Sequence, residues 1–252
     1  MTHFSLAGRA VLVTGAGRGI GLALVERLIG RGVNWVIVVG RDPAPLDALA
    51  ARYQAVVPII EDLCSPDGAK LIAAQAREIS PDLSVVINNA GTQLLTDLFA
   101  ADADRHREAL AAEIAVNFTA TIQLSIELMP QLLAQPSAML VNVTSGLALA
   151  PKQSSPVYCA TKAGIRSFTK ALRYQAQANA PHVRIVEALP PIVDTAMTAG
   201  RGRGKISADA CAAEIVAGME AGKDAIYVGK AKLLRAIFGL SHTAAERIMR
   251  DG

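Results

Sequence analysis

Short apolar runs alternate along the chain with longer stretches rich in alanine and leucine. Seven of the runs predict strands, over residues 10–14, 35–39, 56–60, 84–88, 138–143, 183–188 and 225–228. Nearly all are apolar at every position instead of at alternate positions, which is typical of strands buried on both faces of a parallel sheet. The pattern therefore favours a sheet covered by helices on both sides.

The stretches between these runs predict helices, over residues 19–31, 45–53, 66–79, 104–133, 154–178 and 207–221. Pro130 falls late in the fourth helix and is expected to kink or end it, because proline has no backbone N–H to donate. Strands and helices alternate through the whole chain, with no repeat or linker that would divide it. This indicates one α/β domain over residues 1–252, a doubly wound parallel sheet of about seven strands.

The last stretch, residues 230–252, predicts two short helices around Gly239-Leu240-Ser241. It carries an apolar stripe made up of Leu233, Leu234, Ile237, Phe238 and Leu240. Three places suit such a stripe: the chain's own core, the surface of a second copy, or a flap over a substrate pocket.

Composition narrows the class of protein. At 52% hydrophobic and 19% charged residues, the chain can bury a large core, which excludes a disordered protein. A net charge of +3 and 4% aromatic residues do not favour a nucleic-acid binder. Three scattered cysteines without a CxxC pair, and four scattered histidines, favour a reducing compartment and no metal site. Without signal-peptide features or an apolar run of membrane-spanning length, we expect a cytoplasmic protein with no membrane partner.

A glycine-rich turn follows the first predicted strand, in the order Thr14-Gly15-Ala16-Gly17-Arg18-Gly19-Ile20-Gly21. Glycines permit a tight turn and let a phosphate approach the backbone N–H groups at the start of a helix. The spacing is GxxxGxG instead of the usual GxGxxG. A tight strand-to-helix connection would explain it too, but its position after the first strand favours a nucleotide site. We expect that site to be formed by Gly15, Gly17, Arg18, Gly19, Ile20 and Gly21.

The end of the second strand indicates which dinucleotide binds. A site selective for NAD places a carboxylate there to bind the ribose 2′-hydroxyl, whereas this chain has Gly40 followed by Arg41. Arg41 and Arg18 would bind a 2′-phosphate through charge-assisted hydrogen bonds. Asp42 weakens this interpretation, since it would either pair with Arg41 or bind the ribose if the register is shifted. The residues favour NADP over NAD.

Further motifs follow in a set order. They are Asp62-Leu63 after the third strand, Asn88-Asn89-Ala90-Gly91 after the fourth, Asn117 in the long helix, Ser145 after the fifth strand, and Tyr158-Cys159-Ala160-Thr161-Lys162 at the start of the next helix. Together with the glycine turn, this order resembles the short-chain dehydrogenase/reductase family, in its short single-domain branch, over about residues 6–197. The resemblance implies a Rossmann-like fold and an oxidoreductase.

The resemblance also implies roles for residues around the dinucleotide. Asp62 and the Leu63 backbone would bind the adenine, and Val193 and Thr195 would meet the nicotinamide carboxamide. The cleft would be lined by Asn88, Asn89, Ala90 and Gly91. The chain departs from the family pattern at Pro190-Pro191, where Pro-Gly is usual, so the wall beside the nicotinamide is expected to differ in shape.

Tyr158 and Lys162 are four positions apart, so on a helix their side chains project from one face. A phenol titrates near pH 10, and a cation about 4 Å away would lower that pKa by up to about 3 units. Tyr158 would then exchange a proton with an alcohol or a carbonyl. By resemblance, Ser145 would bind the same substrate oxygen, Lys162 would bind the nicotinamide ribose, and Asn117 would hold a water that links Lys162 to solvent.

The substrate is less well determined. Residues 191–206 are expected to form a substrate loop, and the basic, glycine-rich part from residue 199 to 205 is either a lid for an anionic substrate or a mobile solvated loop. We expect a small carbonyl or alcohol substrate; the alternatives are a 3-oxoacyl thioester, or a regulatory protein that binds NADP(H) without turnover. By resemblance, helices 104–133 and 154–178 would pair copies into a homodimer or homotetramer.

Overall fold

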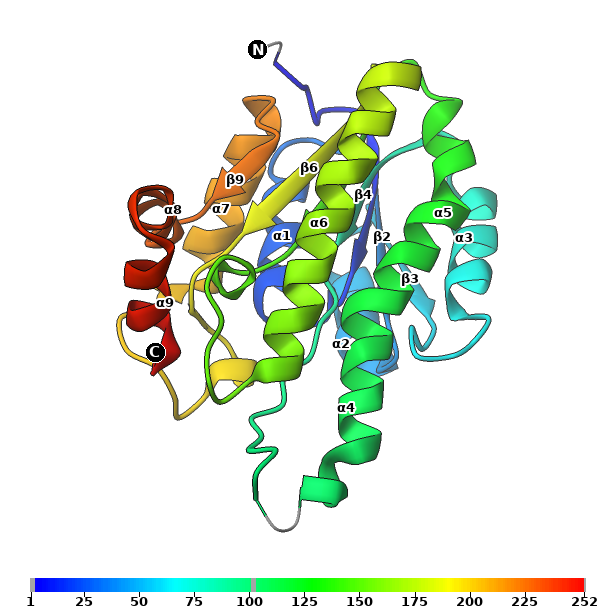
Figure 1. The fold of residues 1–252 in the computed structure, drawn as a ribbon. Helices are drawn as coiled ribbons and strands as arrows, with labels where there is room; N and C mark the ends of the chain where they lie inside the picture. Colours follow the sequence, from blue (N-terminus) through cyan, green and yellow to red (C-terminus); the bar gives the residue numbers. More distant parts are fainter. Residues whose placement is uncertain (1–2, 101–102, 252) are drawn as a thin grey trace.

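The fold is a seven-stranded parallel sheet with helices on both faces, seen in a computed structural model that describes residues 3–100 and 103–251 (Figure 1). The strand order is β3-β2-β1-β4-β5-β6-β9. The strands are β1 (Ala10–Thr14), β2 (Trp35–Gly40), β3 (Val56–Ile60), β4 (Leu83–Asn88), β5 (Ala138–Val143), β6 (Val183–Leu189) and β9 (Ala225–Tyr227). The predicted fold class, a single-domain doubly wound α/β sheet, is confirmed.

Helices α1 (Gly19–Ile29), α2 (Pro43–Arg52) and α7 (Ala208–Glu220) pack on one face of the sheet, where their apolar side chains join those of β1, β2, β4 and β5 in one core cluster. Helices α3 (Gly68–Ile79), α5 (Ala120–Leu133) and α6 (Pro156–Asn179) cover the other face and form a second cluster. Strands β1, β4 and β5 are buried at every position. This two-sided burial explains why their sequences are continuous apolar runs.

The predicted helix over residues 104–133 is interrupted. A 3-10 turn η1 (Ala103–His106) and α4 (Arg107–Ile114) lead into a π-helical turn η2 (Ala115–Thr119), and α5 follows. Helix α5 continues three residues past Pro130 and ends at Leu133, the end of the predicted range. Pro130 lacks only its own N–H, and its carbonyl still accepts a hydrogen bond from the Ala134 nitrogen at 3.2 Å. The helix therefore ends one turn later.

By length and composition alone, the stretch Asp104–Leu133 is apolar enough to cross a membrane. In this fold it has the contacts of a core helix, since α5 packs against α3, β4 and β5. Its buried positions include the polar side chains of Glu113, Asn117, Ser125 and Gln131. A membrane-spanning role would expose such groups to lipid or require other partners for them.

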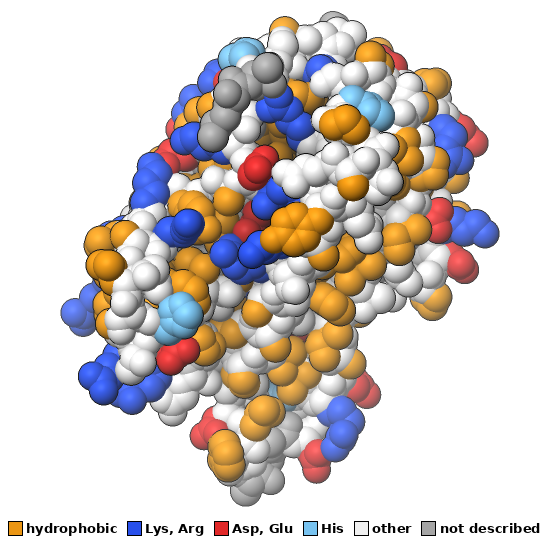
Figure 2. Space-filling model, turned by 45° about the horizontal axis from the view of Figure 1, so that its top comes forward, with side chains coloured by type: hydrophobic (Ala, Val, Ile, Leu, Met, Phe, Trp, Pro, Cys, Tyr) orange, Lys and Arg blue, Asp and Glu red, His pale blue; other side chains and the backbone are white. Residues whose placement is uncertain are grey.

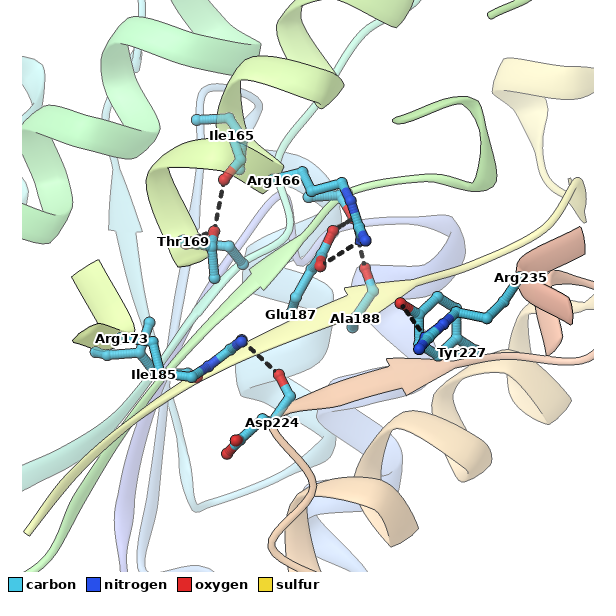
Figure 3. Close-up of polar contacts among 12 residues, drawn as sticks. Ile165, Arg166, Thr169, Arg173, Ile185, Glu187, Ala188, Asp224, Tyr227 and Arg235 are labelled. Carbon is cyan, nitrogen blue, oxygen red and sulfur yellow. Dashed lines mark hydrogen bonds and ion pairs between the residues drawn. The ribbon is translucent and has the colours of Figure 1, made fainter. Parts of the chain in front are cut away.

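Buried polar groups fix α6 on the sheet. Arg166 of α6 pairs with Glu187 of β6, with 2.7 Å between Nη1 and Oε2 (Figure 3). The other Glu187 oxygen accepts a hydrogen bond from the Thr144 hydroxyl at 2.8 Å. Two turns further along α6, Arg173 donates to the Ile185 carbonyl at 2.7 Å and to the Asp224 carbonyl at 2.6 Å (Figure 3). These contacts connect α6 to the strand ends of β5, β6 and β9.

A second set of buried polar groups joins β4 to β5. Asn88 and Asn142 are register partners, and the Asn88 amide donates to the Asn142 Oδ1 at 2.8 Å. Asn142 in turn donates to the Thr169 hydroxyl of α6 at 2.9 Å. The expectation that Asn88 lines the cofactor cleft was therefore wrong. Its side chain points between strand and helices, where its amide also donates to Ser125, and the residues after it reach the cleft.

The C-terminal stretch forms α8 (Ala231–Leu240) and α9 (His242–Arg250), as the sequence predicted. Leu234 and Ala245 are buried in a third cluster with Leu149 and Leu189, so part of the apolar stripe packs on the chain's own core. Its members Leu233 and Leu240 remain 64% and 90% exposed. Before α7, the short strands β7 (Val193–Asp194) and β8 (Ile206–Ser207) pair in a small parallel sheet that the sequence did not predict.

Candidate active site

The candidate site lies where the carboxyl ends of the parallel strands meet, at the edge of the sheet from which α6 begins (Figure 1). The glycine turn follows β1, residues 89–91 follow β4, Ser145 lies just beyond β5, and Pro190 follows β6. Neighbouring parallel strands bring these segments together although they are far apart in the sequence. This edge is also where open α/β sheets bind their ligands.

The glycine turn is a close-packed cradle. Gly15 and Gly19 have φ angles of +64° and +56°, in the left-handed region that favours glycine. A Cβ atom on Gly15 would lie 2.8 Å from the Ala90 Cα, and one on Gly21 would lie 2.0 Å from the Gly15 carbonyl oxygen. Side chains at these positions would collide with backbone, so the spacing of the glycines follows from the packing of the turn on the β4 end.

Helix α1 begins at Gly19, and its N-cap residue Arg18 makes no side-chain hydrogen bond to the first turn. That turn also contains no acidic residue. Its backbone N–H groups are therefore left for an anion, and the helix dipole favours a negative charge there. The Ile20 side chain packs against the core, so its backbone is what faces the turn. The cradle fits the phosphates of a dinucleotide.

Hydrogen bonds hold the β4 end against the glycine turn. The Thr14 hydroxyl accepts from the backbone nitrogens of Asn89 and Ala90, both at 3.0 Å. The Asn89 amide donates to the carbonyls of Thr14 at 3.0 Å and Gly15 at 3.3 Å. The structure thus places the Asn89 side chain as a brace of the turn, while Ala90 and Gly91 lie beside it.

The residues expected to bind the adenosine ribose or its 2′-phosphate lie at the surface. Arg18 and Arg41 are both exposed, and Arg41 acts electrostatically on the Cys64 thiol near Asp62. The Asp42 carboxylate caps α2, where it accepts from the Ala44 nitrogen at 3.3 Å. Gly17 lies against the start of the same helix, since a Cβ on it would be 3.0 Å from the Pro45 ring.

The other expected cofactor residues are spread around the cleft. Asp62 is exposed, and its carboxylate accepts from the Cys64 nitrogen at 2.9 Å, while the Leu63 side chain packs on the second core cluster. Val193 is buried in β7. Thr195 faces the glycine turn, because a Cβ on Gly19 would lie 3.1 Å from its methyl group.

The four expected catalytic residues converge at the start of α6. Ser145 forms a side-chain hydrogen bond with Tyr158. Lys162 is 4% exposed and donates from Nζ to the Val143 carbonyl at 2.9 Å, and this Nζ lies 5.8 Å from the centre of the Tyr158 ring. A Cβ on Gly91 would lie 3.1 Å from the Asn117 Oδ1 and 3.5 Å from the Lys162 Nζ. The structure therefore brings these groups together beside Gly91.

The expected direction of the Tyr158 pKa was wrong. Burial raises the pKa of Tyr158 to about 12, an effect that the hydrogen bond with Ser145 opposes. Burial also lowers the pKa of Lys162 to about 8. The ammonium group is bound to the Val143 carbonyl, and loss of hydration is the largest effect on the Tyr158 pKa. The phenol is therefore a proton donor at neutral pH.

Asn117 lies in the π-helical turn η2, which replaces one turn of α-helix between α4 and α5. Its amide clamps the loop after β4: Oδ1 accepts from the Thr92 nitrogen at 2.9 Å and Nδ2 donates to the Thr92 carbonyl at 2.8 Å. Both ends of the side chain are therefore occupied. Short π-helical turns are frequent at functional sites, because they turn a side chain out of the regular helical spacing.

One residue at the site was missed from the sequence. Glu113 of α4 is fully buried, and its charge acts on both Lys162 and Tyr158. The available signal was its spacing, since Glu113 precedes Asn117 by four positions on a predicted helix and would share its face. An acidic residue on an otherwise apolar helix face would have identified Glu113 as a candidate site residue.

The expected substrate loop lies beside the site. Lys205 donates to the Thr198 carbonyl at 2.7 Å and pairs with Asp194 at 3.3 Å, so it is bound within its own loop. Arg201 is half-buried and acts electrostatically on Tyr158. A surface depression of about 740 Å³ lies between the loop at residues 95–100, the loop at residues 152–156 and the C-terminal Arg250, and Ser145, Tyr158 and Lys162 do not line it.

The chain has relatives among known oxidoreductases. The sequence matches the short chain dehydrogenase family over residues 9–205. It is 36% identical over 192 residues to the uncharacterized oxidoreductase DltE of Bacillus subtilis, covering 76% of this chain and 74% of that protein. It is 32% identical over 195 residues to L-xylulose reductase of Homo sapiens, covering 76% and 75%. The chain belongs to the short-chain dehydrogenase/reductase family of oxidoreductases.

Solved structures show the same fold. A short chain dehydrogenase from Burkholderia cenocepacia in complex with NADP superposes with a TM-score of 0.85 at 27% identity, covering 98% of this chain and 99% of that one. A family member from Burkholderia phymatum in complex with NAD has a TM-score of 0.83 at 22% identity, covering 99% and 98%. At 22% identity, the similarity to the Burkholderia phymatum protein supports the fold alone.

Proposed function

We propose that this oxidoreductase interconverts a carbonyl and a secondary alcohol with a nicotinamide dinucleotide. The observation that carries the proposal is the convergence of Ser145, Tyr158 and the buried Lys162 at the edge of the sheet that also holds the glycine cradle. The name of one relative, a reductase of L-xylulose, supports a carbonyl substrate. When bound, the dinucleotide would supply or accept a hydride.

The chain's own residues would then handle the proton. Ser145 would donate a hydrogen bond to the substrate oxygen and hold it next to the phenol. In the direction of reduction, Tyr158 would give its proton to that oxygen as the alcohol forms; in oxidation it would take the proton back. Lys162 would bind the nicotinamide ribose and stabilise a phenolate, and Asn117 holds the loop that borders the site.

The protein would be tested with reduced NADP or NAD and a panel of ketones, sugars and 3-oxoacyl thioesters, with loss of nicotinamide absorbance as the measure. Turnover of a ketone or sugar supports the proposal. Turnover confined to the thioesters would identify a 3-oxoacyl-thioester reductase of the same family. Binding of the dinucleotide without turnover of any carbonyl would overturn the proposal and favour a regulatory protein that senses NADP(H).

We further propose that NADP is the preferred dinucleotide, because Arg18 and Arg41 are exposed just beyond the ends of β1 and β2 and the 27% identical neighbour binds NADP. Replacement Arg41→Ala is expected to weaken NADP binding by about ten-fold or more, which is the loss of one charge-assisted contact to phosphate. NAD binding is expected to stay unchanged. Both affinities are measured by fluorescence titration.

The matched control is Arg52→Ala, which removes an exposed arginine from α2 that pairs with Glu26. It is expected to leave both affinities unchanged. An equal loss for NADP and NAD in the Arg41 variant would contradict a 2′-phosphate contact.

We also propose a homodimer or homotetramer formed through the face that carries α4 to α6. Large apolar side chains are exposed there, with Ile126 at 62%, Tyr174 at 57% and Leu133 at 46%. Figure 2 shows hydrophobic side chains exposed between charged ones on this side of the molecule. Exposed apolar faces of this kind are typical of protein–protein contacts, and here the proposed partner is a second copy of the chain.

A further inference from the structure

Glu113 is a fully buried carboxylate at the active site that the proposed reaction does not use. It lies in α4, where Oε2 accepts a hydrogen bond from the Leu94 nitrogen at 3.2 Å. In the part of the chain that the structure describes, Oε1 has no hydrogen-bond partner. A carboxylate in such a place carries a large cost of lost hydration unless a nearby positive charge offsets it.

The positive charge that faces Glu113 is Lys162. One turn after Glu113, Asn117 reaches the same spot beside Gly91 as the Lys162 Nζ. Lys162 is itself buried, and Glu113 is the charged group that acts on it. Glu113 also acts on Tyr158 and on the thiol of Cys159, both in α6. The other charges that face these groups are Arg201 toward Tyr158 and Lys152 toward Cys159.

We propose that Glu113 is a positioning residue: a buried counter-charge that keeps the Lys162 ammonium group protonated inside the fold. The second half of the proposal, that it thereby sets the pH range in which Tyr158 exchanges protons, rests on the proposed function. The first half does not, since it concerns the charge state of a lysine.

The electrostatics of the site support this assignment. Burial lowers the pKa of Lys162, and the negative charge of Glu113 opposes that change. The same charge disfavours a phenolate and so raises the pKa of Tyr158. Removal of the Glu113 charge would therefore lower both pKa values. A residue that only fixed the Leu94 loop would have no such effect, because glutamine also accepts a hydrogen bond from that nitrogen.

The decisive variant is Glu113→Gln, measured by NMR titration of lysine labelled with ¹³C at Cε. The Lys162 signal is identified as the one missing from Lys162→Arg. We expect its titration midpoint to fall by about one pH unit, the order of effect of removing one nearby charge from a partly polarisable interior. The matched control Glu108→Gln removes an exposed carboxylate from the same helix, and should leave the midpoint in place.

The wild-type protein provides a second measurement that needs no folded variant. A coupled pair titrates in two steps, so the Lys162 signal should show a second, smaller step on the acid side of its main step, as Glu113 is protonated. A single step in the wild type, or a Glu113→Gln midpoint equal to the wild type, would overturn the counter-charge.

Turnover separates this inference from the proposed function. For carbonyl reduction, the activity lost at high pH should be lost about one pH unit earlier in Glu113→Gln, because Tyr158 gives up its proton sooner. If the Lys162 midpoint moves while the pH at which activity is lost stays the same, the link to Tyr158 is wrong. If no carbonyl is turned over at all, the proposed function fails and the lysine titration still decides the role of Glu113.

Discussion

Replacement of Tyr158 by phenylalanine is expected to lower kcat for carbonyl reduction by about 10²–10⁴-fold, the usual contribution of a general acid. The ring still fills its place at the start of α6, but the hydroxyl that bonds with Ser145 is lost. The phenol of Tyr158 is protonated at neutral pH and supplies this proton. Ser145, the other group of the pair, cannot supply it as readily. Dinucleotide affinity should stay within about two-fold, measured by fluorescence of the reduced nicotinamide.

Tyr174→Phe is the matched control, since Tyr174 lies in the same helix and is 57% exposed. It should leave both kcat and affinity unchanged. If the Tyr158→Phe protein retains more than about a tenth of wild-type activity, Tyr158 is not the proton donor and another group supplies the proton.

Lys162→Met is expected to abolish turnover. In a Glu113→Gln background, where no buried carboxylate loses its counter-charge, it is expected to stabilise the fold at pH 7 by about 2 kcal/mol. Burial lowers the pKa of Lys162 to about 8, whereas an unfolded lysine titrates near 10.4. A shift of about 2 units corresponds to about 3 kcal/mol of cost for holding the charge in the folded protein at pH 7. Loss of the hydrogen bond to the Val143 carbonyl reduces this gain in stability by about 1 kcal/mol.

The pH dependence of this effect has a definite sign. Between about pH 8 and pH 10.4 the unfolded chain binds one more proton than the folded protein at this position, so the wild type becomes more stable as pH rises. The advantage of Lys162→Met should therefore be largest below pH 8 and shrink toward pH 10. Urea denaturation at pH 7 and pH 9.5 measures it, with the exposed Lys170→Met of the same helix as control. If Lys162→Met lowers the stability of the Glu113→Gln protein at pH 7, the Lys162 charge is well solvated in the fold.

Much of the fold could be predicted because burial leaves a direct mark on the sequence. The seven strands are apolar runs, and β1, β4 and β5 are buried at every position. The glycine turn could be placed for a similar reason, since a side chain on Gly15 or Gly21 would collide with backbone. The convergence of Ser145, Tyr158 and Lys162 followed from the order of motifs along parallel strands.

What could not be predicted depends on three-dimensional burial and on which partner a polar group chooses. The Tyr158 pKa rises because burial removes the hydration of its hydroxyl, while the Lys162 ammonium group binds the Val143 carbonyl. Asn88 turned inward because Asn142 stands opposite it in the register. Spacing alone likewise gave no sign of the π-helical turn at Asn117.

The amide contact between Asn88 and Asn142 has a consequence for how members of this fold can diverge. A slip of one residue between β4 and β5 would turn both amides away from each other and leave them buried without partners, at a cost of about 1–3 kcal/mol for each group. The two strands therefore end at fixed relative heights, with residue 89 beyond one and residue 145 beyond the other. Surface loops farther out can change length and chemistry for a new substrate while the proton-exchanging groups keep their alignment.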